Sequence, residues 1–172
     1  MAIKDWHQDE RPREKLLQKG AESLSDSEIL ASLEMGKRYL ASQVKQAPTL
    51  NASQLVKDYL TTQLRPLNRE VFAVLFLTNQ LTLIQYEVLF TGGISSCSVC
   101  VREVLRCALK YGASQLIIAH NHPSTSATAS QADLEITRSL AKACQLVDMT
   151  LIDHIIVGQD GTLSLQETGK MP

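Results

Sequence analysis

The stretch from Gln115 to Asp133, QLIIAHNHPSTSATASQAD, decides how the rest of the chain is interpreted. It begins with a short apolar run that is typical of a buried strand, and it passes directly into two histidines separated by one residue. Residues two apart in an extended backbone point to the same side, so His120 and His122 can converge on one ion. Ser130 stands where a helix is expected to begin, which places Asp133 in the first turn of that helix. The stretch therefore predicts a strand, a loop and a helix that bring two imidazoles and a carboxylate together.

This ligand set is typical of a catalytic zinc site. Three protein ligands leave a fourth position open, whereas structural zinc sites are normally closed by four ligands that often include sulfur. The loop at residues 123–129 must fold back for Asp133 to become the third ligand. Zinc lowers the pKa of a bound water to around 7, but hydrolysis also needs a base that takes the proton. Periodicity alone does not choose among the candidate bases, which are Glu70, Glu87, Glu103 and Glu135.

The sequence on both sides of this stretch has the pattern of an α/β domain. The apolar run Val71–Leu77 predicts a strand that is covered on both faces, and a second β-rich run follows a turn at Asn79 and Gln80. We expect a helix to end at Gly112, with one apolar face made by Val101, Val104, Leu105, Ala108 and Leu109. A helix near 131–146 and strands near 149–158 and 162–165 complete a mixed β-sheet with helices on both faces.

The N-terminal part predicts a short helical head. Ser25 can cap a helix, and Glu28 three residues later completes a capping box. The apolar stripe of this helix comprises Ile29, Leu30, Leu33 and Leu40. The segment at residues 44–53, which contains Pro48, has the composition of a linker, and Asn51 with Gln54 offers a cap for the next helix. That helix carries Leu55, Val56, Tyr59 and Leu60. We expect a head and linker at residues 1–48 and a metal-binding domain at residues 49–172.

The composition is that of an ordinary globular protein, with 44% apolar and 20% charged residues in a chain of 172. No apolar run approaches the roughly 20 residues that cross a bilayer, and the N-terminal residues are charged, so we expect a cytoplasmic protein without a membrane partner. In that compartment Cys97, Cys100, Cys107 and Cys144 should remain thiols. Cys97 and Cys100 form a CxxC pair, but no second pair or nearby histidine completes a zinc site.

Two of these segments resemble known families. The segment from His120 to Asp133, HNHPSTSATASQAD, matches the JAMM metalloprotease signature. His120, His122, Ser130 and Asp133 lie at the matching positions. VREVLRCALKYGASQLIIAHNHPS and LIDHIIVG resemble the bacterial RadC family. The resemblance implies a cytidine deaminase-like JAB/MPN fold and one zinc ion per chain. It also implies that the histidines and the aspartate bind zinc, that Ser130 helps to hold the substrate carbonyl oxygen, and that Glu70 is the general base.

Other roles are open for several of these residues. Ser130 can act as a helix cap, and Glu70 can pair with Arg69 at the surface. Asp153 and His154 lie in a predicted strand, and either could orient a ligand histidine, because such imidazoles usually donate their second N–H to a neighbouring group.

Two functions are consistent with these features. The first is a zinc-dependent hydrolase of peptide or isopeptide bonds, which would act on a peptide or protein substrate. The second is a non-catalytic metal-binding or regulatory module associated with DNA repair or DNA metabolism, as the RadC resemblance suggests. RadC proteins usually carry a helix-hairpin-helix segment that holds DNA phosphates, but here Ala31 to Glu34 connect the two flanking similarities directly. The formal net charge of −1 likewise gives no support for DNA binding, and the only local basic cluster is Arg11–Lys15.

We therefore predict that the chain binds duplex DNA weakly, without the steep salt dependence that several phosphate contacts impose. The measurement is a titration of labelled duplex DNA at several salt concentrations. Submicromolar binding at physiological salt that collapses as the salt concentration rises would support the DNA-associated module instead.

Overall fold

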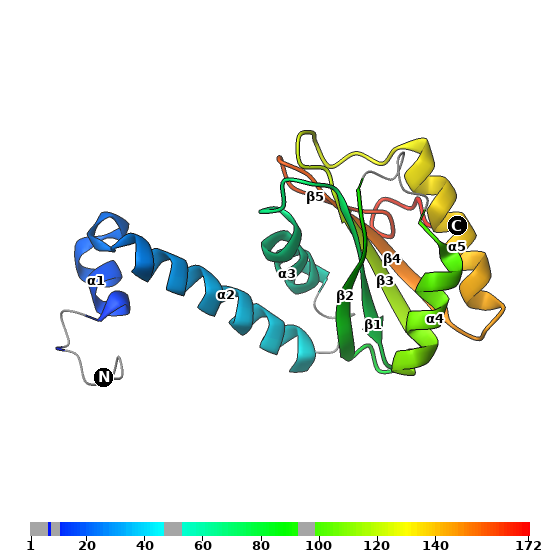
Figure 1. Ribbon diagram of the computed structural model, residues 1–172, viewed down its shortest axis with the longest axis horizontal. Helices are drawn as coiled ribbons and strands as arrows, with labels where there is room; N and C mark the ends of the chain where they lie inside the picture. Colours follow the sequence, from blue (N-terminus) through cyan, green and yellow to red (C-terminus); the bar gives the residue numbers. More distant parts are fainter. Residues whose placement is uncertain (1–6, 8–10, 47–52, 93–98) are drawn as a thin grey trace. The chain divides into compact units, whose positions relative to one another are not determined.

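The computed structural model describes residue 7 and residues 11–46, 53–92 and 99–172 (Figure 1). The chain divides into two compact units, Met1–Tyr39 and Leu40–Pro172. The larger unit contains the whole stretch from Gln115 to Asp133. Within the described residues, no helix is both long enough and apolar enough to cross a membrane.

A five-stranded sheet forms the centre of the larger unit (Figure 1), with the strand order β2-β1-β3-β4-β5. β1 (Val71–Leu77) pairs antiparallel with both β2 (Leu83–Thr91) and β3 (Gln115–Asn121). β4 (Thr150–Val157) runs parallel to β3, and β5 (Thr162–Ser164) runs antiparallel to β4. The sheet is therefore mixed, as predicted, and the predicted hairpin of β1 and β2 is confirmed. β3, which carries His120 and leads to His122, lies in its middle.

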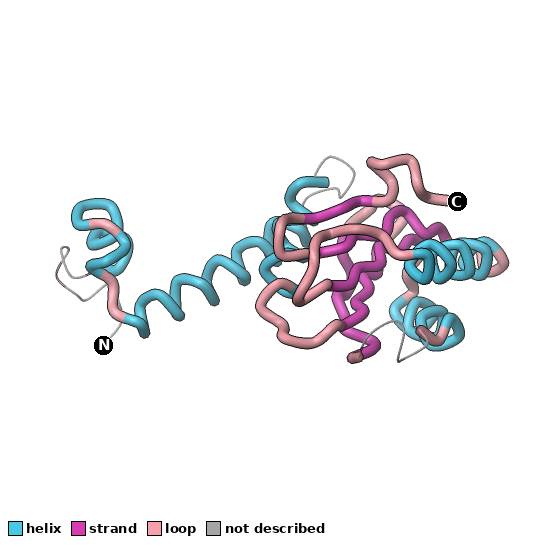
Figure 2. The backbone as a smooth tube through the Cα atoms, turned by 90° about the horizontal axis from the view of Figure 1, so that it is seen from above, coloured by secondary structure: helices cyan, strands magenta, loops and turns pink. Residues whose placement is uncertain are grey.

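Helices cover both faces of this sheet. α4 (Val101–Tyr111) and α5 (Gln131–Gln145) lie together on one side, and α3 (Ser53–Leu64) lies on the other (Figures 1 and 2). α5 connects the parallel strands β3 and β4, which need a crossover of this kind. These helices confirm the predicted α/β class.

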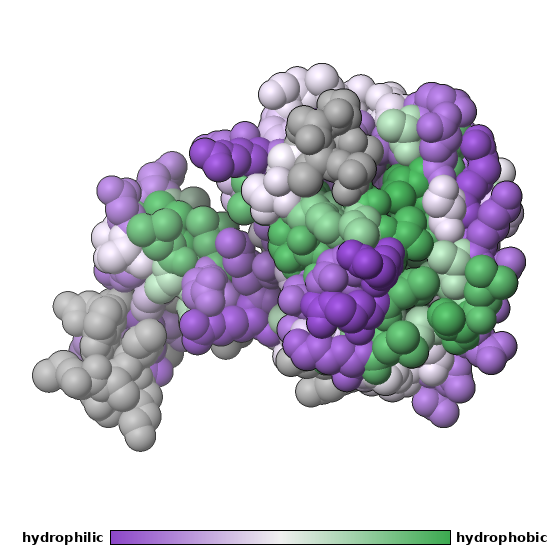
Figure 3. All heavy atoms as spheres, turned by 45° about the vertical axis from the view of Figure 1, so that its right-hand side comes forward, coloured by the Kyte–Doolittle hydropathy of each residue, from purple (hydrophilic) through white to green (hydrophobic). Residues whose placement is uncertain are grey.

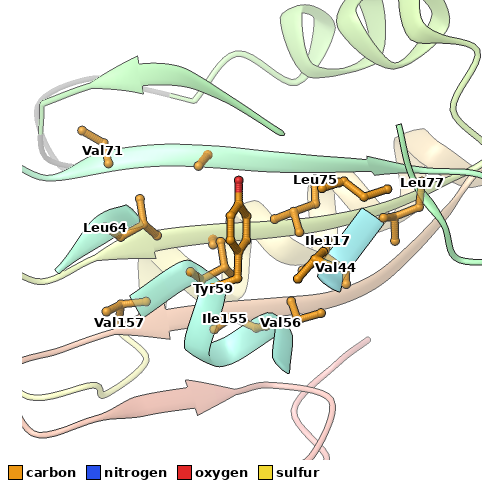
Figure 4. Packing of buried hydrophobic residues seen from close by; sticks show 14 of the residues in the cluster. Val44, Val56, Tyr59, Leu64, Val71, Leu75, Leu77, Ile117, Ile155 and Val157 are labelled. Carbon is orange, nitrogen blue, oxygen red and sulfur yellow. The ribbon is translucent and has the colours of Figure 1, made fainter. Parts of the chain in front are cut away.

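Two apolar clusters pack against the two faces, because successive residues of a strand point to opposite sides. All seven residues of β1 are buried, so this strand contributes to both clusters as predicted. On the α3 side, Tyr59 and Leu64 pack against Leu75 of β1, Ile117 of β3 and Ile155 of β4 (Figure 4). Val44 from the end of α2 (Asp26–Gln46) joins the same cluster.

The N-terminal unit contains α1 (Pro12–Lys19), a short 3-10 helix (Ala21–Ser23) and the first part of α2. The predicted capping box is confirmed, because the Glu28 carboxylate accepts hydrogen bonds from the backbone N–H and the hydroxyl of Ser25. These bonds, together with Lys15, lower the pKa of Glu28 to about 2. Apolar side chains lie at the surface of this unit (Figure 3), among them Leu17, Leu30 and Leu33, which are 74%, 67% and 60% exposed.

Two predictions about helices need correction. The linker was expected to start at residue 44, but α2 continues to Gln46, and the remaining linker residues 47–52, including Pro48 and Asn51, lie outside the described residues. On α4, Leu109 is 61% exposed, whereas Cys107 is buried. At 3.6 residues per turn, Leu109 lies about 140° around the helix from the buried Val104, and Cys107 lies within about 60° of it.

Candidate metal centre

The two histidines stand at the C-terminal end of β3. His120 is 1% exposed, and His122 is half-buried just past the last residue of the strand. The backbone N–H of His122 donates to the Val157 carbonyl at 2.8 Å, which continues the pairing with β4 and keeps the backbone extended. The two Nε2 atoms are 3.0 Å apart, as expected for residues that share one side of a strand.

The loop at residues 123–129 is fastened to the turn that joins β4 to β5. The Gln159 N–H donates to the Thr125 carbonyl at 3.0 Å, and the Ala127 N–H donates to Asp160 Oδ1 at 2.9 Å. A Cβ on Gly158 would lie 2.2 Å from the backbone nitrogen of Ala127, so only glycine leaves room for the loop there. The loop in turn holds His122, because the Ser126 carbonyl lies 3.2 Å from its Nδ1. A carbonyl can only accept, so His122 donates from Nδ1, and in the neutral imidazole this tautomer makes Nε2 the acceptor atom.

The loop ends at a capping box that orients Asp133. Ser130 caps α5, and its hydroxyl accepts from the Asp133 N–H at 3.2 Å. In return, Asp133 Oδ2 accepts from the backbone N–H of Ser130 at 2.8 Å and from its hydroxyl at 2.7 Å. The expected cap is thus present. The second carboxylate oxygen of Asp133 is directed away from the cap, toward the histidines.

Three acceptor atoms therefore converge in a buried place. Oδ1 of Asp133 lies 3.3 Å from His120 Nε2, and the three ligand atoms of His120, His122 and Asp133 lie within 4.8 Å of one another. Burial lowers the pKa of His120 to about 4, with the Asp133 carboxylate opposing this shift and His122 adding to it. His120 is then neutral at pH 7, and the buried Oδ1 receives no hydrogen bond. A buried acceptor without a donor is costly, and a cation bound between the three atoms would satisfy it. The residues present fit a metal ion.

Glu70 comes directly before β1, at the same end of the sheet. Phe72 of β1 pairs with His120, which is the last pair of this antiparallel register, so Glu70 precedes β1 at the edge of the sheet where β3 leads to His122. The side chain of Asn121 fixes the approach to β1. Its Oδ1 accepts from the Val71 N–H at 2.8 Å, and its amide donates to the carbonyls of Arg69 and Leu67 at 3.1 and 3.3 Å.

Asn121 was not selected from the sequence as a functional residue. It lies between the two histidines, and strand alternation turns its side chain to the opposite face of the sheet, where it is buried. A buried amide needs hydrogen-bond partners, and an asparagine at this position of a buried strand was the signal that could have identified it.

The other candidate bases are held by their own neighbours. Glu87 accepts a hydrogen bond from the Tyr111 hydroxyl at 2.8 Å. The Arg106 guanidinium binds Glu103 and lowers the pKa of that carboxyl. Glu135 is exposed on α5 and accepts from Gln131 at 3.2 Å. Among the described residues no ion pair joins Glu70 to Arg69, which leaves Glu70 as the candidate that the geometry favours.

Of the two residues considered as supports for a ligand histidine, the structure brings only His154 to the centre. His154 Nε2 lies 2.8 Å from His120 Nδ1. The Asp153 carboxylate instead accepts from the Ser164 hydroxyl at 2.6 Å and from the N–H groups of His154 and Gln166. Asp153 therefore holds the segment around β5 and does not contact a ligand.

The described cysteines lie outside the centre. Cys107 and Cys144 are buried in the apolar cluster beneath α4 and α5, and Cys100 is exposed before α4. All three are free thiols, and Cys97 lies outside the described residues. Within the part of the chain that the structure describes, His120, His122 and Asp133 form the only group of three such side chains close enough to share an ion.

Comparison with known families agrees with this geometry. Residues 50–170 match the RadC-like JAB domain, and residues 3–70 match the UPF0758 N-terminal family. The chain belongs to the RadC-like JAB domain family. The match includes the whole sheet and every residue of the candidate centre. A JAB-type domain with this group of side chains is compatible with a metal-dependent hydrolase or a regulatory module.

Several relatives are similar over their full length. A UPF0758 protein of Psychrobacter sp. (strain PRwf-1) is 48% identical, and the alignment covers all of both chains. UPF0758 proteins of Psychrobacter cryohalolentis and Acidithiobacillus ferrooxidans are 49% and 40% identical and are covered over 99% of their length. The alignment with the first relative extends over 225 positions, whereas this chain has 172 residues. A substantial stretch of the relatives' sequence therefore has no counterpart here.

The tight contact at Gly158 gives a prediction. Replacing Gly158 with alanine should displace the loop that holds His122, lower the stability by about 1–3 kcal/mol as overpacking does, and weaken metal binding. The measurements are urea unfolding and zinc affinity. Gly36→Ala is the matched control, because nothing lies within 4 Å of a Cβ on this helical glycine. If Gly158→Ala bound zinc as tightly as the control, the loop would have no part in positioning His122.

Proposed function

We propose that this protein is a zinc-dependent hydrolase of peptide or isopeptide bonds, with one zinc ion per chain held by His120, His122 and Asp133. The observation that carries the proposal is the buried Asp133 Oδ1, which receives no hydrogen bond and lies 3.3 Å from His120 Nε2. Two imidazole nitrogens beside a carboxylate oxygen that receives no hydrogen bond form an arrangement that a bound cation would satisfy.

The donor set supports zinc in particular. Two imidazole nitrogens and one carboxylate oxygen are ligands typical of catalytic zinc, and three protein ligands leave a position open for water or substrate. When bound, zinc lowers the pKa of a water molecule to around 7 and polarises a substrate carbonyl.

In this proposal Glu70 is the general base. It would accept the proton of the attacking water and then donate it to the leaving amine, as a positioned carboxylate can. Its place just before β1, at the end of the sheet where β3 leads to His122, supports this role. The Asn121 side chain supports it too, because it fixes the backbone on both sides of Glu70 through Arg69 and Val71.

Ser130 is proposed to stabilise the oxyanion. Its backbone belongs to the cap of α5, and its side chain is exposed beside the buried Asp133. In the structure the hydroxyl donates to Asp133 Oδ2, so it must turn away from that oxygen to donate to a substrate carbonyl. The backbone N–H of Ser130 would still hold Asp133 during this rotation.

The resemblance to JAMM metalloproteases supports the proposed class of substrate. The proposed substrate is a peptide or protein in the cytoplasm, and the relatives' names specify neither a substrate nor an activity. We propose that the stretch absent here relative to those relatives includes the helix-hairpin-helix segment, which would leave a function without DNA binding.

Two substitutions separate catalysis from metal binding. Glu70→Gln should retain close to one zinc per chain, because the amide keeps the size of the side chain, yet hydrolysis should fall by about 10²- to 10⁴-fold, since the amide cannot accept a proton. Asp133→Asn should lose zinc and activity together. The measurements are zinc content and cleavage of peptide and isopeptide libraries, with Glu87→Gln as the control.

Unchanged cleavage by Glu70→Gln would place the base elsewhere. Full zinc with no cleavage of either library by the natural protein would favour the non-catalytic module, and full zinc retention by Asp133→Asn, His120→Ala and His122→Ala would refute the metal site.

A further inference from the structure

A chain of hydrogen bonds runs through the buried interior behind His120. His154 Nε2 lies 2.8 Å from His120 Nδ1, and His154 Nδ1 lies 2.7 Å from the Thr137 hydroxyl. That hydroxyl donates to the Asp133 carbonyl at 2.5 Å. His154 and Thr137 are 0% and 1% exposed, so water does not compete for these bonds. The chain starts and ends at residues of the candidate metal centre and connects β3, β4 and α5.

The direction of each bond follows from the number of protons available. The Asp133 carbonyl has none, so the short contact uses the only proton of the Thr137 hydroxyl. The hydroxyl oxygen must then accept from His154, which therefore carries a proton on Nδ1. A second proton on His154 would make a fully buried cation whose two ring nitrogens face a hydroxyl and an imidazole, neither of which is an anion that could pair with it. His154 Nε2 is consequently an acceptor, and His120 donates to it from Nδ1.

We propose that Thr137 and His154 are positioning residues that hold His120 in its Nδ1–H tautomer and aim its Nε2 lone pair at the metal ion. This inference rests on the proposed metal site. The same hydroxyl fixes the first turn of α5 through the Asp133 carbonyl, so one threonine links the imidazole ligand on β3 to the carboxylate ligand on α5. Neither residue touches the substrate or the ion.

Thr137 lies outside the family signature, yet in this proposal it determines the tautomer of a metal ligand. Thr137→Val keeps the shape of the side chain but removes the acceptor, which leaves the His154 Nδ1–H without a partner and removes the reason for its tautomer. Thr137→Ser keeps the hydroxyl. If Thr137 acted only in packing, Thr137→Ser would weaken the site more than Thr137→Val, whereas the proposed role predicts the reverse.

The test uses the full chain and two readouts. Long-range nitrogen–proton NMR of the metal-free protein should show His120 protonated on Nδ1 in the natural protein and in Thr137→Ser, and a mixture of tautomers in Thr137→Val. Zinc affinity, measured by competition with a chromophoric chelator, should fall about 10- to 100-fold in Thr137→Val and stay within a few-fold of the natural value in Thr137→Ser. Ser139→Ala is the matched control, because Ser139 makes the same bond to the carbonyl four residues earlier on the exposed face of α5.

Two results would overturn the proposal. The first is an NMR spectrum of the natural protein that shows His120 protonated on Nε2. This result does not depend on the folding of any variant. The other is a folded Thr137→Val protein with unchanged zinc affinity and an unchanged tautomer. If the natural protein bound no zinc, the proposed function would fail. The His120 tautomer in the metal-free protein would still show whether Thr137 and His154 position this imidazole.

Discussion

Three acceptor atoms held together in a buried place are the constraint on which the structure around the centre depends. His120 Nε2 lies 3.0 Å from His122 Nε2 and 3.3 Å from Asp133 Oδ1, and that carboxylate oxygen receives no hydrogen bond. An unsatisfied buried group costs about 1–3 kcal/mol, and more when it is charged. The Asp133 oxygen stays in this place without a donor because the surroundings fix each of the three side chains.

The surroundings that fix these atoms come from distant parts of the chain. β4 aligns the backbone of His122, the turn at Gly158 holds the loop, and the capping box turns Asp133 inward. The stable core of the fold thus holds side chains in an arrangement that would be unfavourable by itself. A metal ion that binds only the folded chain would raise the free energy of unfolding, because binding to the native state shifts the unfolding equilibrium toward it.

Much of this architecture could be predicted from local pattern. The apolar run of β1, the capping box at Ser25 and the His-x-His spacing each depend on neighbours within a few residues, so the sequence specifies them directly. The supports of the site could not be found in this way. The choice between Asp153 and His154 depends on a register shift in the pairing of β3 with β4, between Leu116 and Ile117, which decides the face to which each side chain points. Thr137 reads locally as an ordinary helix residue, and only the packing of α5 on β4 makes it a partner of His154.

The measurement that tests the central claim most directly is X-ray absorption spectroscopy of the zinc-loaded protein, because it identifies the ligand atoms independently of activity. The account predicts two imidazole nitrogens and one carboxylate oxygen with a fourth nitrogen or oxygen ligand, at about 2.0–2.2 Å, and no sulfur. A sulfur ligand at about 2.3 Å, or a shell without imidazole, would place the metal elsewhere in the chain and contradict the site formed by His120, His122 and Asp133.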